Sequence, residues 1–124
     1  MTEKVYTQNA PDAIGPYSQA VKANGFVFTS GQIAINPATG NVEATDIEGQ
    51  TEQVMKNLKA VLEASGSSLE NAIKTVCFLA DMNDFGKFNE IYGKYFSTKP
   101  ARSCVAVKTL PKNVLVEVEV IAEA

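Results

Sequence analysis

The 124-residue sequence contains no histidine. This absence excludes Ser-His and Cys-His nucleophile pairs, general acid–base catalysis by imidazole and nearly every catalytic zinc arrangement. Proton transfer is left to carboxylate, tyrosine, lysine, thiol and ordered water. We expect no metal ion and no organic cofactor, because the sequence contains no motif for either.

Clustered charge and long apolar runs are also missing. Eleven basic residues stand against 14 acidic ones, and no block of five residues carries a single sign, so no nucleic-acid partner is expected. No stretch approaches the ~18 apolar residues of a membrane span, and the N-terminal residues do not resemble a signal peptide. The sequence predicts one soluble, cytoplasmic domain over residues 1–124, with no membrane partner.

Cysteine is scarce. Cys77 and Cys104 lie far apart, each within an apolar run, and neither belongs to a CxxC motif. A reduced, buried thiol is the expected state, in keeping with a reducing compartment.

The apolar residues that are present predict an alternation of strands and helices. Asn24-Gly25 separates two β-prone runs and is typical of a hairpin turn. A capping box at Thr45–Glu48 and a stop at Ser65-Gly66 bound one amphipathic helix, and a second begins near Asn83 and ends before Pro100. Strands are expected at about 3–6, 18–22, 26–30, 72–80, 101–109 and 114–122.

This order predicts an α+β fold: a single mixed sheet of five to six strands, covered on one face by two helices. The last two strands are expected to form a hairpin through residues 110–113. The other face of the sheet is then left to be buried in an oligomer.

Alternation in the last two strands suggests a shared face for four functional side chains. Arg102, Cys104, Glu117 and Glu119 fall on one side of the sheet if the valines of both strands share the core. Spacing alone favours a solvated cross-strand charge pair, worth up to ~1 kcal/mol, over a functional site.

Three motifs shift this balance. The segment PARSCVAVKTLPKNVLVEVEVIA (residues 100–122) resembles the signature of the RidA/YjgF family, and AIGPYSQAV (13–21) and FTSGQI (28–33) are similar to two further family motifs in the same order. The likeness covers essentially the whole chain. It implies a chorismate-mutase-like fold and a homotrimer with clefts between subunits.

The resemblance also implies a role for individual residues. Arg102 would bind the substrate carboxylate, for which a planar guanidinium suits better than a lysine ammonium. Glu117 would be the general acid/base, and Tyr17 would form a wall of the pocket and offer its hydroxyl. The remaining implied substrate-binding residues are Ser30, Gly31, Cys104 and Asn89; Cys104 is expected to hold water through its main-chain carbonyl rather than to act as a nucleophile.

The function implied by the resemblance is an enamine/imine deaminase. Such an enzyme would hydrolyse 2-imino acids derived from 2-aminoacrylate, namely 2-iminopropanoate and 2-iminobutanoate, to 2-oxo acids and ammonia. A non-catalytic regulatory trimer that binds a small 2-oxo or amino acid in the same cleft is the alternative. Relatives also suggest endoribonuclease or holdase activity, but the acidic, histidine-free composition argues against ribonuclease chemistry.

Overall fold

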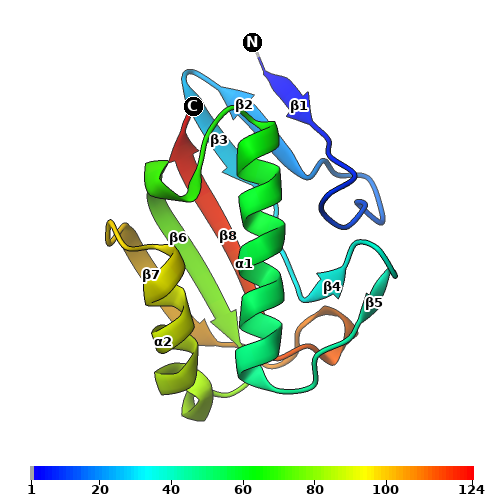
Figure 1. The fold of residues 1–124 in the computed structure, drawn as a ribbon, viewed down its shortest axis with the longest axis vertical. Helices are drawn as coiled ribbons and strands as arrows, with labels where there is room; N and C mark the ends of the chain where they lie inside the picture. The colour runs from blue at the N-terminus through cyan, green and yellow to red at the C-terminus, as the bar shows by residue number, and fades with distance from the viewer. Residues whose placement is uncertain (1) are drawn as a thin grey trace.

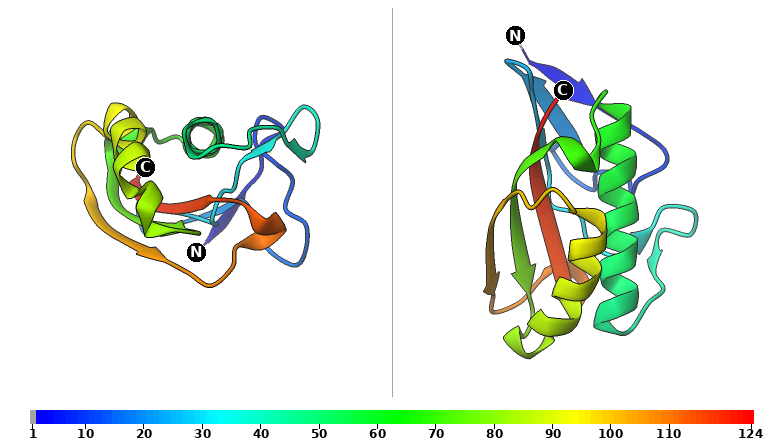
Figure 2. Two further views of the ribbon diagram at one scale, coloured as in Figure 1. Left: turned by 90° about the horizontal axis from the view of Figure 1, so that it is seen from below. Right: turned by 60° about the vertical axis from the view of Figure 1, so that its left-hand side comes forward.

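One six-stranded sheet and two helices make up most of the molecule, and the computed structural model describes residues 2–124. Both helices lie on the same side of the sheet (Figures 1 and 2). The strand order is β1-β2-β3-β8-β6-β7, and a separate two-stranded ribbon is formed by β4 and β5. This confirms the predicted α+β class. The strands are β1 (Glu3–Val5), β2 (Ala20–Ala23), β3 (Phe26–Thr29), β4 (Ile35–Asn36), β5 (Asn41–Val42), β6 (Ala72–Leu79), β7 (Ala101–Ala106) and β8 (Val116–Glu123).

Helix α1 (Ile47–Ala64) spans the sheet and supplies most of its cover. Its N-cap is Asp46, whose carboxylate accepts a hydrogen bond from the Gly49 N–H at 2.8 Å. The buried stripe of α1 packs on β8 and β3, so the core lies between this helix and the middle of the sheet.

Helix α2 (Phe85–Tyr95) is shorter and covers the β6–β7 end of the sheet (Figure 1). A 3₁₀ turn over Met82–Asp84 precedes it, which places the helix start slightly later than predicted. Phe88, Tyr92 and Phe96 stack along its inner side, with ring centroids 5.6 and 4.8 Å apart.

The predicted hairpin between the last two strands is wrong. Strand β6 lies between them: it pairs in parallel with β7 and antiparallel with β8. The connection from β6 through α2 to β7 is a crossover, which is how two parallel neighbours must be joined. Strand β7 is therefore an edge strand, and β8 lies inside the sheet.

The sheet face opposite the helices is uncovered and partly apolar. Phe26, Phe28 and Val105 lie on it and expose 38%, 43% and 47% of their surface. Among residues 2–124, no helix is long and apolar enough to cross a membrane.

Candidate functional site

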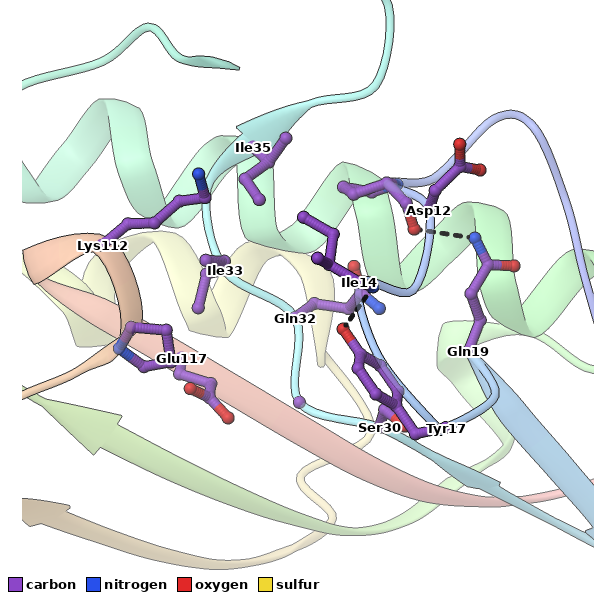
Figure 3. Close-up of a pocket in the computed structure, with 13 residues that line it drawn as sticks. Asp12, Ile14, Tyr17, Gln19, Ser30, Gln32, Ile33, Ile35, Lys112 and Glu117 are labelled. Atoms are coloured by element: carbon purple, nitrogen blue, oxygen red, sulfur yellow. Dashed lines mark hydrogen bonds between the residues drawn. The ribbon is translucent and has the colours of Figure 1, made fainter. Parts of the chain in front are cut away.

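A cavity of about 480 Å³ opens beside β8, at the end of β3 (Figure 3). Four predicted site residues line it: Tyr17, Ser30, Gly31 and Glu117. They come from the loop before β2, the turn after β3, and β8, three segments that are distant in the sequence. The remaining lining residues are Pro11, Asp12, Ile14, Gln19, Gln32, Ile33, Ile35, Pro111 and Lys112.

Tyr17 forms one wall of the cavity, and 53% of its surface is exposed. Its hydroxyl oxygen accepts a hydrogen bond from the Ile14 N–H at 3.3 Å (Figure 3). The hydroxyl proton remains available for a ligand. Gly15, with φ of +134°, supplies the backbone conformation that turns the chain back beneath the ring.

Gln19 fixes the loop that carries this wall. Its side chain is 2% exposed, and its amide nitrogen donates to the carbonyl oxygens of Thr7 and Pro11 at 3.0 and 2.8 Å. The amide oxygen accepts from the Thr7 N–H at 2.7 Å. A single buried amide thus holds the loop against the start of β2.

The turn after β3 is fixed on both sides of Gly31. The Ser30 hydroxyl donates to the Ser18 carbonyl oxygen at 2.6 Å, and the Gln32 N–H donates to the Val118 carbonyl oxygen at 2.9 Å. The Ser30 hydroxyl proton is therefore engaged within the chain and is not free to donate to a ligand.

Glycine at position 31 lets the Glu117 carboxyl group lie directly against the turn. A Cβ atom built at Gly31 would overlap the Glu117 Oε2 atom and lie only 2.8 Å from Cδ and 3.0 Å from Cγ. No other residue type fits here without moving the glutamate.

Glu117 is half-buried on the uncovered face of β8. Burial, and then the negative charge of Glu119 two residues along the strand, raise the pKa of the Glu117 carboxyl above its ordinary value. A carboxyl group with a raised pKa exchanges protons closer to neutral pH, as a general acid/base requires.

Arg102 does not share this face, so the predicted common face is wrong. Arg102 pairs in register with the buried Thr75, whereas Glu117 pairs with Phe78 and points to the opposite side. The prediction failed because it placed the β7 valines in the core: in this edge strand Val105 faces away from the helices.

Helix α2 forms a cradle around Arg102 from Phe85, Asn89 and Tyr92. The guanidinium carbon lies 5.3 Å from the Phe85 ring centroid and 4.8 Å from that of Tyr92, and Nη1 donates to the Asn89 Oδ1 atom at 2.6 Å. The spacing i, i+4, i+7 places these three side chains on one stripe of the helix. Asn89 is therefore a hydrogen-bond partner of Arg102 within the chain.

Cys104 lies two residues from Arg102 on the same, helix-covered face and is half-buried. Burial raises the pKa of its thiol, and the positive charge of Arg102 opposes this rise. A protonated thiol is a weaker nucleophile than a thiolate.

The structure thus divides the predicted residues into two groups. Tyr17, Ser30, Gly31 and Glu117 line the cavity. Arg102 and Cys104 lie on the edge strand β7, and Asn89 lies on α2, which covers that strand. Sequence analysis missed Lys112, whose side chain lines the cavity from the turn before β8. It also missed the aromatic residues of the Arg102 cradle, although their helical spacing was visible.

Both the sequence and the structure of this chain are similar to those of known proteins. Residues 7–124 match the family model described as Endoribonuclease L-PSP. A RutC family protein of Pyrococcus horikoshii is 55% identical over 98% of both chains. Reactive Intermediate Deaminase A of Arabidopsis thaliana, a chloroplastic protein, is 50% identical over 97% of this chain and 65% of its own length.

The chain belongs to the RidA/YjgF family. The crystal structure of Escherichia coli TdcF with bound serine superposes with a TM-score of 0.93 at 44% identity, covering 98% of each chain. The family includes reactive intermediate deaminases, which supports a deaminase role for this RidA/YjgF protein at the level of the reaction class.

Proposed function

We propose that this protein hydrolyses 2-imino acids derived from 2-aminoacrylate, such as 2-iminopropanoate and 2-iminobutanoate, to 2-oxo acids and ammonia. The observation that carries the proposal is a raised-pKa carboxyl group, Glu117, facing a cavity in a chain without histidine. The relationship to a reactive intermediate deaminase supports the reaction class. Two free cysteines are consistent with action in the cytoplasm.

The chemistry demands little from the protein. A protonated imine is already electrophilic, so orienting one water and fixing the carboxylate supply much of the rate enhancement. Glu117 takes a proton from the attacking water and returns one to the departing nitrogen. Arg102 binds the carboxylate, and the Tyr17 hydroxyl donates a hydrogen bond to the substrate.

A complete site requires two subunits, because Glu117 and Arg102 lie on opposite faces of the sheet within one chain. We propose a homotrimer in which the uncovered face of one subunit meets the β7 edge of the next. The exposed Phe26, Phe28 and Val105 side chains support this arrangement, since an apolar sheet face needs cover. Arg102 and Cys104 would then face the Glu117 cavity of the neighbour.

Coupled turnover tests the reaction. The purified protein is added to a serine or threonine dehydratase acting on its substrate, and residual imine is trapped with semicarbazide. We expect the protein to divert imine into free 2-oxo acid, and Glu117→Gln to lose this effect. Trapping that is unaffected by the wild-type protein would reject the proposal.

Mixing two inactive variants tests the shared site. Arg102→Ala retains Glu117, and Glu117→Gln retains Arg102, so a site between two different subunits can contain both native groups. Random co-assembly at equal amounts restores about one quarter of the wild-type sites, because each site draws its two halves independently from neighbouring subunits. A site confined to one chain would give no recovery, and this outcome would refute the two-subunit arrangement.

A non-catalytic, carboxylate-binding trimer is the second candidate. The serine bound to TdcF favours it, since that relative holds an amino acid in its crystal structure. Under this alternative the wild type binds pyruvate or 2-oxobutanoate but does not change semicarbazide trapping, and Glu117→Gln alters affinity alone.

A further inference from the structure

Cys77 and Cys104 are direct neighbours across the parallel pair of β6 and β7. The two residues are partners in the strand register, so their side chains leave the sheet on the same, helix-covered face. Both are free thiols. Their proximity is not visible in the sequence, where 26 residues separate them.

The strand spacing suits a covalent link. Neighbouring strands lie ~4.8 Å apart, and a disulfide joins Cα atoms that are about 4.4–6.8 Å apart. Joining the two sulfur atoms therefore needs side-chain rotation and a shift of β7 toward β6. Strand β7 is an edge strand, which allows the small adjustment that remains.

The two thiols differ in access and charge. Cys77 is fully buried, and burial raises its pKa to about 12. Cys104 is half-buried and therefore the more accessible thiol; burial raises its pKa too, and the positive charge of Arg102 offsets part of that rise. Cys104 is thus the first thiol to react with an oxidant, and Cys77 is positioned to react second.

We propose that Cys77 and Cys104 form a reversible intrachain disulfide under oxidising conditions, and that this disulfide weakens carboxylate binding at Arg102. With a peroxide, the Cys104 sulfur is oxidised to a sulfenic acid as the O–O bond breaks and water leaves. The Cys77 sulfur then attacks that sulfur while its proton passes to the departing hydroxyl group, which forms the S–S bond and releases a second water. Two thiols and one hydrogen peroxide give one disulfide and two waters.

The disulfide changes the site because Cys104 lies two residues from Arg102. Drawing the Cys104 sulfur toward β6 shifts β7 relative to α2, and the Arg102 cradle is built between these two elements. We expect weaker carboxylate binding and slower turnover in the oxidised protein. The effect on turnover rests on the proposed deaminase function, whereas formation of the disulfide does not.

The test uses diamide, which removes one hydrogen atom from each thiol of a pair and leaves a lone thiol intact. Native wild-type protein is oxidised, and its free thiols, intact mass and linked peptides are then measured under non-reducing conditions. We expect both thiols to disappear, the mass of each chain to fall by two hydrogen atoms, and one peptide pair to link positions 77 and 104. Dithiothreitol should restore both thiols.

Cys77→Ala is the matched control, since it removes the partner thiol and leaves the proposed catalytic and binding residues in place. Diamide should lower wild-type turnover several-fold and leave Cys77→Ala unchanged. Cys77→Ser serves if the alanine variant fails to fold. Two thiols that persist in native wild-type protein, or links only between chains, would overturn the inference. A disulfide that forms in a protein without imine turnover would instead refute the deaminase proposal and leave the redox site standing.

Discussion

Replacing Gly31 with alanine tests the contact between the turn and the proposed acid/base. The new Cβ atom would lie 2.8 Å from Cδ and 3.0 Å from Cγ of Glu117, whereas carbon atoms pack at about 3.5–4.0 Å. The carboxyl group must therefore move by about 1 Å or more, since the Cβ atom would also overlap the Oε2 atom. A displacement of ~1 Å at a reacting group can lower the rate ~100-fold, so we expect kcat/KM to fall by about that factor, or ~2.7 kcal/mol of transition-state stabilisation.

The fold should tolerate the same substitution. Gly31 does not have a positive φ, and the side chain that must move lines an open cavity. We expect the free energy of unfolding to change by no more than about 1–2 kcal/mol, measured by denaturant titration. Imine turnover is measured in the semicarbazide-trapping assay.

Gly86→Ala is the control for the glycine substitution. Gly86 lies in α2, and a Cβ atom added there meets no atom within 4 Å. Alanine in an exposed helix should stabilise the protein by up to ~1 kcal/mol and leave turnover unchanged. Wild-type kcat/KM in Gly31→Ala would refute the argument that Glu117 must lie against this turn to act.

Two further predictions concern the charged residues. Arg102→Lys should fold normally but lose about tenfold or more in kcat/KM. The lysine ammonium keeps the positive charge but lacks the planar fork and cannot stack in the same way on Phe85 and Tyr92. Wild-type kinetics in this variant would show that Arg102 does not bind the substrate carboxylate. Glu119→Gln should move the acidic limb of the pH–rate profile to lower pH, because the Glu119 charge helps to raise the pKa of Glu117; an unmoved limb would show that Glu117 does not set it.

The pKa of Glu117 also links pH to stability. The pKa of Glu117 is higher in the folded protein than in the unfolded chain. At a pH between these two pKa values, the folded protein therefore binds more protons than the unfolded chain does. The stability associated with protonated Glu117 is therefore present at low pH and is lost as pH rises through the folded-state pKa. Glu119→Gln should reduce this loss of stability, because it removes the charge that helps to raise the pKa of Glu117.

Local signals in the sequence were enough for most elements. The Asn24-Gly25 turn joins β2 to β3, both of its residues have positive φ, and the apolar stripes of α1 and α2 face the sheet as predicted. The ribbon of β4 and β5 was missed because strands of two residues are too short to show alternation. Such elements are fixed by tertiary contacts, here by Asn57, whose amide donates to the carbonyl oxygens of Ile33 and Ile35.

Strand pairing was harder to predict than strand position. Consecutive strands with a short link suggested a hairpin, but the preceding strand–helix–strand segment was also a crossover unit that predicts a parallel pair. In the structure β7 pairs in parallel with β6 and its other edge has no partner strand, so the hairpin with β8 does not form. The mostly apolar, β-branched run in β6 was the available signal, since a strand of that composition belongs between two neighbours.

The alternation of β8 was correct and couples the fold to the site. Val116, Val118 and Val120 are buried beneath α1, while Glu117 and Glu119 alternate onto the uncovered face. A register shift of one residue would bury both carboxylates and expose all three valines, at a cost of about 1.5 kcal/mol or more per valine and far more for the charges. The core of this strand therefore fixes the direction of Glu117, and no separate interaction is needed to point the proposed acid/base into the cavity. Arg102 lies on the opposite face because it pairs in register with the buried Thr75, and the sheet itself then separates the two groups within one chain. The proposed catalysis by both groups therefore relies on the proposed site between two chains.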